Sequence, residues 1–124
     1  MENLFEAGLD TLKQKLLTMA SRTETAVNQS VQALVQRDLT LALHVKEDDR
    51  VIDQFEVEID DLVIQLLTKA PLATNLRLVT VAMKVSQNLE RIGDEATKIA
   101  KRARDLAQEP PIKLSLDLIY VKLN

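Results

Sequence analysis

Two carboxylates one turn apart on a predicted helix are the residues of this sequence best suited to chemistry. They are Glu90 and Asp94, in the stretch Leu89-Glu90-Arg91-Ile92-Gly93-Asp94-Glu95-Ala96. A spacing of four residues puts both side chains on one helical face. Gly93 lies between them, although glycine is unfavourable in the interior of a helix. Such a pair becomes a cation site only if further oxygen ligands face it.

The elements that would position this pair are long helices. From Phe5 to about Gln36, apolar residues recur every three or four positions, which predicts one amphipathic helix. Its stripe runs through Leu9, Leu12, Leu16 and Met19 and then moves to Val27, Val31 and Leu34, so we expect the buried face to drift around the axis. Asp38 is suited to cap the next helix, because its side chain can accept from free backbone amides.

The second predicted helix runs from Leu39 to about Lys69 and ends before Pro71, which lacks an amide proton. One inward register fits it, and seven of its eight members are apolar: Leu41, Val45, Asp48, Ile52, Phe55, Ile59, Leu62 and Leu66. The exception, Asp48, lies within the densest acidic stretch of the chain.

The third predicted helix begins with Thr74 or Asn75 as its cap and is stopped by Pro110-Pro111. Alternating intervals of four and three residues predict its inward seam: Leu78, Ala82, Val85, Leu89, Ile92, Ala96, Ile99, Ala103 and Leu106. A basic tail of Lys98, Lys101, Arg102 and Arg104 complements the dipole of this helix, and we interpret it as a solvated face.

Short connections between long helices make them antiparallel neighbours. The predicted fold is therefore all-α, an antiparallel three-helix bundle. Residues 1–109 form the bundle, and residues 110–124 form a Pro-Pro junction with the start of a further apolar helix.

Residues equally distant from a turn lie level with each other on antiparallel helices. With the second turn at about residues 70–73, Glu90 falls opposite Asp53 and Asp94 falls opposite Asp49. Four carboxylates at one level repel one another unless a cation intervenes. We therefore predict a metal site formed by Asp49, Asp53, Glu90 and Asp94. Oxygen ligands suit Mg, Ca, Mn, Fe or a carboxylate-bound Zn.

A second interpretation stays open, in which these acids form a solvated face paired with Arg50, Arg91 and Lys98. Glu56 and Asp60 have the same spacing but fall opposite Gln87 and Met83, so we expect them outside the first ring of ligands. The single histidine, His44, is more typical of a surface or core residue than of a ligand.

The composition excludes several function classes. The chain has no cysteine, a net charge of −3 and only three aromatic residues, Phe5, Phe55 and Tyr120. Thiolate chemistry is therefore absent, and neither electrostatic attraction to nucleic acid nor base stacking is expected. No apolar run is long enough to span a membrane. The acidic start of the sequence does not resemble a secretory signal, so we expect a cytoplasmic protein.

The acidic stretches also resemble the PhoU family of phosphate-uptake regulators. The resemblance rests on the stretch from Glu47 to Asp60, on the Glu90-Arg91-Ile92-Gly93-Asp94 motif, on the opening of the third helix at Leu76-Arg77-Leu78-Val79, and on Glu109-Pro110-Pro111. PhoU-like proteins are two tandem three-helix bundles, and this sequence contains one repeat and the first residues of a second.

The resemblance implies a non-enzymatic negative regulator of phosphate transport and of phosphate-starvation signalling. It implies a multinuclear Fe or Zn cluster on Asp49, Asp53, Glu90 and Asp94, and as partners the ATP-binding subunit of the phosphate transporter and a sensor histidine kinase. With a single repeat, either the sequence is part of a longer chain or two copies associate to rebuild the two-bundle body, and on the second alternative we expect a homodimer. The alternatives are a metal-dependent helical enzyme that uses the same carboxylates, and a metal-free helical adaptor.

Overall fold

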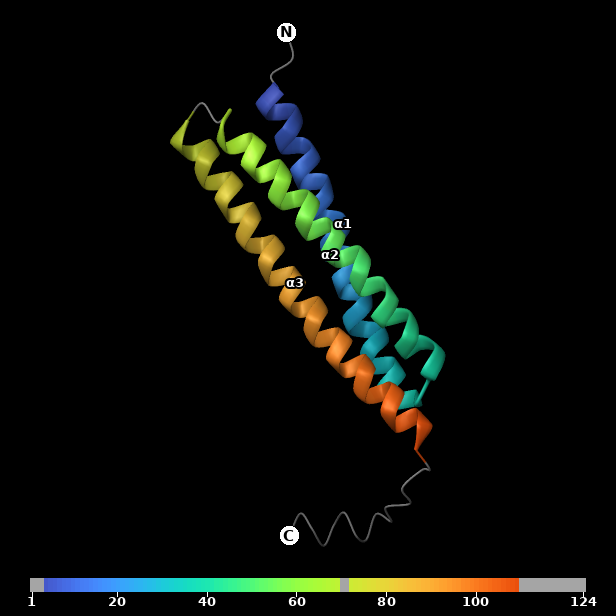
Figure 1. Cartoon of the computed structure of the whole chain (residues 1–124). Helices are drawn as coiled ribbons and strands as arrows, with labels where there is room; N and C mark the ends of the chain where they lie inside the picture. The colour runs from blue at the N-terminus through green and yellow to red at the C-terminus, as the bar shows by residue number, and fades with distance from the viewer. Residues whose placement is uncertain (1–3, 70–71, 110–124) are drawn as a thin grey trace, which may run out of the picture.

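The computed structural model of the chain describes residues 4–69 and 72–109. Three long helices run up, down and up: α1 (Leu4–Gln36), α2 (Leu39–Leu67) and α3 (Ala73–Gln108) (Figure 1). Each helix packs against the other two, and the described residues contain no strand. The predicted all-α antiparallel three-helix bundle is therefore confirmed. The predicted junction and apolar segment, 110–124, lie outside the described residues.

The turn between α1 and α2 also holds the end of α3. Asp38 caps α2 as predicted, because its Oδ1 accepts from the backbone amide of Leu41 at 3.0 Å. Arg37 before it has a φ of 55°, in the left-handed region. Its Nη2 atom donates to the carbonyl oxygens of Leu106 and Glu109. The Leu106 carbonyl also accepts from the Glu109 amide at 3.3 Å, so Arg37 adds a second donor there and supplies a donor to the Glu109 carbonyl.

The turn between α2 and α3 differs from the prediction at both ends. α2 ends at Leu67 rather than at about Lys69, and Pro71 lies outside the described residues. The N-cap of α3 is Leu72, which makes no side-chain capping bond, so the prediction of Thr74 or Asn75 as the cap was wrong. α3 starts earlier than predicted. The carbonyl of Leu72 accepts from the backbone amides of Asn75 and Leu76, which is the first hydrogen-bonded turn of the helix.

The buried face of α1 keeps one register along its whole length. Phe5, Leu12, Met19, Ala26 and Ala33 follow one another at seven-residue intervals and are all buried. The predicted drift of the stripe was therefore wrong. Val31 is 47% exposed, because the small side chains of Ala26, Ser30 and Ala33 carry the contact instead.

Half of the predicted inward positions of α2 are buried, and the other half are each replaced by the residue one position later. Val45, Ile52, Ile59 and Leu66 are buried, and Leu41, Asp48, Phe55 and Leu62 are half-buried. Ala42 and Val63 complete the buried face.

The seam of α3 is rotated from its predicted position. Of the nine predicted residues, Ala82, Ala96 and Ala103 are buried, whereas Leu78, Val85, Ile92 and Leu106 are 39–53% exposed. The buried residues lie one position later along the helix, and all but Val79 are small. They are Val79, Ser86, Gly93 and Ala100. Small residues let the backbone of α3 approach its neighbours closely, while large side chains on α1 and α2, such as Met19 and Ile52, fill the core.

Candidate metal centre

The inward register of α2 contains two carboxylates. Asp49 and Glu56 continue the alternating three- and four-residue intervals of Ala42, Val45, Ile52, Ile59, Val63 and Leu66. These two residues are half-buried for this reason. The Oδ1 atom of Asp49 is buried and has no hydrogen-bond partner. A carboxylate oxygen in this state costs folding free energy unless a cation or a proton satisfies it.

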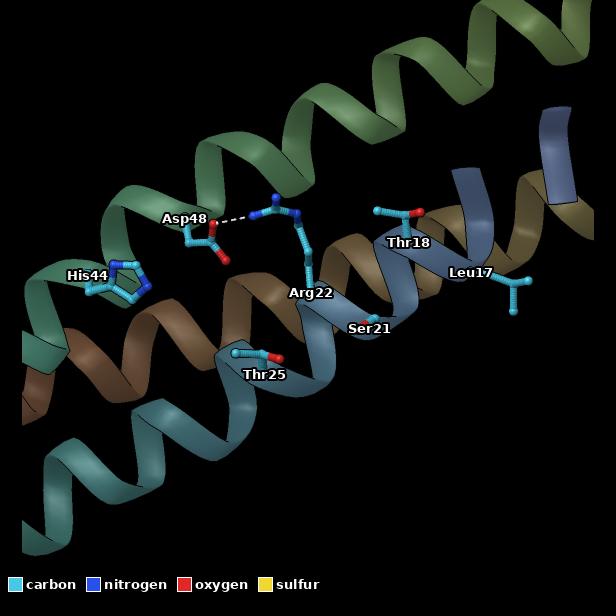
Figure 2. A pocket seen from close by; sticks show the side chains of 7 residues that line it. All are labelled: Leu17, Thr18, Ser21, Arg22, Thr25, His44 and Asp48. Carbon is cyan, nitrogen blue, oxygen red and sulfur yellow. Dashed lines mark hydrogen bonds and ion pairs between the residues drawn. The ribbon is translucent and has the colours of Figure 1, made fainter. Parts of the chain in front are cut away.

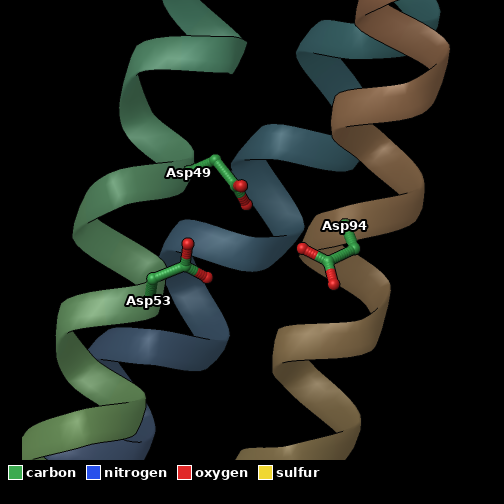
Figure 3. A group of neighbouring side chains, drawn as sticks. All are labelled: Asp49, Asp53 and Asp94. Carbon is green, nitrogen blue, oxygen red and sulfur yellow. The ribbon is translucent and has the colours of Figure 1, made fainter.

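Asp49 lies close to two further carboxylates, Asp53 on its own helix and Asp94 across the groove between α2 and α3. One oxygen each of Asp49, Asp53 and Asp94 lies within 4.8 Å of the others (Figure 3). Asp49 and Asp94 are half-buried and Asp53 is exposed, so the group opens to solvent on one side. Oxygen atoms this close can ligate one hard cation, or bridge two. We call Asp49, Asp53, Asp94 and Glu90 together the acidic cluster.

Glu90 joins the cluster through Asp94. A hydrogen bond to Asp94 is the largest of the effects that raise the pKa of Glu90 to about 7; burial and the charges of Asp94, Glu56 and Asp53 add to it. The protonated carboxyl of Glu90 donates in this bond and the Asp94 carboxylate accepts. Glu90 is therefore partly protonated near neutral pH, as is expected of a carboxyl close to other carboxylates.

The same crowding acts on α2. Burial raises the pKa of Asp49, as do the charges of Asp53 and Asp94. The side chain of Thr97 and the charge of Lys101 lower it, with smaller effects. The pKa of Asp53 is raised by burial and by Asp94. Ionising all of these carboxylates at once is unfavourable because they repel one another. A bound cation would remove this repulsion and would serve as the missing partner of the buried oxygen.

Glu56 lies near the cluster without belonging to the group of three close carboxylates. Burial and the charges of Asp60, Asp53 and Asp94 raise its pKa. Asp60 lies on the same flank, and its Oδ1 atom is buried without a partner. The signal in the sequence was the register of Glu56 between Ile52 and Ile59, which marks an inward position.

Gly93 gives the cluster its room. A Cβ atom at this position would lie 3.3 Å from Cγ2 of Ile52 and 3.4 Å from Oδ1 of Asp49. The distance to Ile52 is slightly tighter than most Cβ contacts, so Ile52 would have to shift by a few tenths of an ångström, whereas the distance to Asp49 is an ordinary van der Waals contact. Glycine at this point lets α3 approach α2 while Asp49 stays in place.

The basic residues of the solvated-face interpretation are differently engaged. Arg91, Lys98 and Lys101 line the groove beside Asp49 and Asp94. Lys98 pairs with Glu95 at 3.1 Å, however, and no ion pair in the described part of the chain joins Arg50, Arg91 or Lys98 to the acidic cluster. The negative charge of the cluster is thus not neutralised by direct pairing within residues 4–69 and 72–109.

His44 lies in another groove, between α1 and α2 (Figure 2). There Arg22 of α1 reaches across to Asp48 of α2, with 2.9 Å between Nη1 and Oδ1. The hydroxyl residues Thr18, Ser21 and Thr25 line the same groove. His44 is therefore not among the residues that face the acidic cluster.

Comparison with known proteins gives this architecture a family. The PhoU domain matches residues 16–103, which include all four acids of the cluster. The chain belongs to the PhoU family. It is 43% identical over 106 residues to the phosphate-specific transport system accessory protein PhoU homolog of Pseudomonas putida, covering 85% of this chain and 41% of that protein.

Two further relatives carry similar names. The PhoU homolog of Aquifex aeolicus is 37% identical over 94% of this chain and 51% of its own length. The accessory protein PhoU of Escherichia coli K12 is 34% identical over 91% of this chain and 48% of its own length. The chain thus spans about half the length of the curated relatives it matches. No described helix is long and apolar enough to cross a membrane.

Proposed function

We propose that this PhoU-family chain is a non-enzymatic regulator of phosphate transport whose acidic cluster binds metal. The names of its relatives support the accessory role, since each is called a phosphate-specific transport system accessory protein. In this proposal the protein acts in the cytoplasm as a negative regulator of phosphate uptake and of phosphate-starvation signalling. Its partners there are the ATP-binding subunit of the transporter and a sensor histidine kinase.

The observation that carries the metal proposal is the buried, unpartnered Oδ1 of Asp49. One carboxylate oxygen of Asp49 lies within 4.8 Å of an oxygen of Asp53 and of Asp94, and no ion pair among the described residues joins Asp49 to a cationic side chain. Asp49, Asp53, Glu90 and Asp94 would hold the ion, with Glu56 beside them. Fe and Zn are the metals that family resemblance favours, and the all-oxygen ligands also suit Mg, Mn and Ca.

Metal at this position would supply charge neutralisation and a link between two helices. Asp49 and Asp53 belong to α2, and Glu90 and Asp94 belong to α3, so the ligands span the groove. Two residues of the chain would contribute: Gly93 lets α3 lie close to Ile52 beside Asp49, and Glu90, whose pKa is raised to about 7, would release its proton when metal binds. The surface offered to a partner would then change from a repelling group of carboxylates to a fixed, less negative one.

Metal analysis of the full chain, purified without chelator, tests this proposal. We expect the wild type to retain metal, and the Asp53→Ala/Glu90→Ala variant to lose most of it. Glu95→Ala is the matched control, because Glu95 lies on the same helix but is exposed and pairs with Lys98. Equal metal content in the wild type and the double variant would show that the cluster is not the site.

The regulatory part has its own test. We expect the ATP-binding subunit of the phosphate transporter to be captured by the metal-loaded chain and less well by the double variant. Capture that does not differ between the two would separate partner binding from the cluster. No capture by either protein would contradict the transporter role of this chain.

A further inference from the structure

Thr97 is a buried polar residue at the edge of the acidic cluster. Its side chain belongs to a residue that is only 9% exposed. Among the described residues that line the groove beside Asp49 and Asp94, Thr97 is the one without a charge. It follows Asp94 by three positions on α3, so the two side chains lie on the same face of the helix. A hydroxyl group in this place can donate one hydrogen bond to a carboxylate.

The hydroxyl of Thr97 donates within its own helix in this structure. Its Oγ1 atom lies 3.0 Å from the carbonyl oxygen of Gly93, four residues earlier. Thr11, at an exposed position of α1, donates to the carbonyl of Ala7 in the same way at 3.1 Å. This bond is an ordinary feature of threonine in a helix and does not by itself indicate a function.

A second acceptor, the carboxylate of Asp49, faces the same hydroxyl. Burial and the charges of Asp53 and Asp94 raise the pKa of Asp49, and a hydrogen bond with Thr97 opposes them. Thr97 has a single hydroxyl proton, so it can donate to Gly93 or to Asp49 but not to both at once. While it donates to Gly93, the Oδ1 atom of Asp49 is buried without a partner.

Redirecting the hydroxyl proton requires little rearrangement. Rotation of the O–H bond changes the acceptor while the Oγ1 atom of Thr97 stays in place. The carbonyl of Gly93 lies in the interior of α3, so it keeps the backbone hydrogen bond of the helix after the proton has turned away. Asp49 in turn gains a donor, and a hydrogen bond to a charged oxygen is stronger than one to a neutral carbonyl.

We propose that Thr97 is a positioning residue of the metal site, whose hydroxyl donates to the Asp49 carboxylate and holds it in the orientation that leaves one oxygen free for metal. Carboxylates that ligate a metal are commonly held by such hydrogen bonds, and loss of the partner typically weakens metal binding by about 10–100-fold. This role rests on the proposed metal function of the acidic cluster. α3 then contributes to the site twice, with Glu90 and Asp94 as ligands and with Thr97 as the residue that orients a ligand of α2.

Two substitutions that separate the hydroxyl of Thr97 from its methyl group test this role. Thr97→Ser keeps the hydroxyl and loses the methyl group, whereas Thr97→Val keeps the methyl group and loses the hydroxyl. Zn²⁺ alone is titrated into the chelator-treated, dialysed full chain against a competing coloured chelator. We expect Thr97→Val to bind Zn²⁺ about 10–100-fold more weakly than the wild type, and Thr97→Ser to stay close to the wild type. Thr11→Val is the matched control, because it removes an equivalent hydrogen bond at an exposed position of α1.

The order of the two variants distinguishes positioning from packing. If Thr97 had a purely structural role, Zn²⁺ affinity would follow the thermal stability of the metal-free proteins, in which Thr97→Val is at least as stable as Thr97→Ser because it keeps the buried methyl group. Thr97→Val that binds as tightly as the wild type, or more tightly than Thr97→Ser, would overturn the positioning role and leave the metal site in place. A wild type that binds no Zn²⁺ would overturn both. If Thr97→Val does not fold, Thr97→Ala takes its place and should also bind more weakly than Thr97→Ser.

Discussion

The two flanks of α3 have opposite chemistry. Toward α2 the helix presents Glu90 and Asp94, which meet Asp49 and Asp53 across a groove. Toward α1 it presents Leu78, Val81 and Val85, which line an apolar groove. Between the flanks runs one column of mostly small residues that holds the bundle together.

The difference between the two flanks follows from the small size of the inward residues on α3. A core of small residues on α3 leaves the larger side chains and the charged ones at its edges. Among the described residues, one edge of α3 brings carboxylates close enough to repel one another, and the other edge exposes apolar side chains to solvent. A cation would remove the repulsion, and contact with another apolar surface would bury the exposed area.

The largest expected effect concerns the packing beneath the acidic flank. Ile52 is fully buried and would touch any side chain placed at Gly93. We expect Ile52→Ala to lower the free energy of unfolding by about 2–5 kcal/mol, because it leaves a cavity in the core. Urea denaturation measures the change. Val57→Ala, at a 54% exposed site of the same helix, should cost less than about 1 kcal/mol.

If Ile52→Ala cost no more than Val57→Ala, the acidic flank would not rest on a rigid core. The comparison between the flanks would then fail, because the positions of Asp49 and Asp53 depend on the packing of the residues between them.

The next effect concerns the acidic flank itself. Asp49→Asn removes a half-buried charge with a raised pKa, so we expect the metal-free protein to gain on the order of 1 kcal/mol of stability at pH 7. The same variant should lose the thermal stabilisation that added metal gives to the wild type. Thermal unfolding with and without chelator measures both effects. Asp61→Asn, an exposed site on α2, is the control and should change neither.

A destabilised metal-free Asp49→Asn protein would contradict this account. It would mean that Asp49 makes a favourable interaction in the fold that outweighs burial and repulsion.

A smaller effect is expected from pH. The pKa of Glu90 is about 7 in the folded protein and near 4.5 in an unfolded chain. Between these values the folded state binds the extra proton, so stability falls as pH rises through this window and levels off above about pH 7. We expect the melting temperature of chelator-treated protein to decrease from pH 5 to 8. Glu90→Gln should flatten that slope, and saturating metal should reverse it, because metal displaces the proton.

The level of the two acidic pairs could be predicted from the sequence because it depends on few quantities. A helix has a fixed rise, and the turn near residue 71 sets which residues of α2 and α3 lie side by side. The resulting neighbours, Asp49 with Asp94 and Asp53 with Glu90, need no knowledge of side-chain conformation. What the structure adds does depend on conformation: the hydrogen bond between Glu90 and Asp94, and the buried Oδ1 of Asp49.

The seam of α3 could not be predicted in the same way. Two columns one residue apart are both compatible with its periodicity, and hydrophobicity alone favours the one that contains Leu78, Ile92 and Leu106. The structure buries the other column because helix approach depends on side-chain size, and Gly93 and Ala100 permit a closer contact. Size matching among three helices is a property of the packed bundle that the periodicity of one helix does not contain.

The smallest effect tests that choice of column directly. Ile92 is 45% exposed, whereas Ile52 is fully buried. We expect Ile92→Ala to lower the free energy of unfolding by less than about 1 kcal/mol, because little packing is lost around a half-exposed side chain. Urea denaturation of Ile92→Ala beside Ile52→Ala measures the difference between the same substitution at two isoleucines. If the two variants lost equal stability, Ile92 would belong to the core of the bundle, and the choice of the column of small residues as the inward one would be wrong.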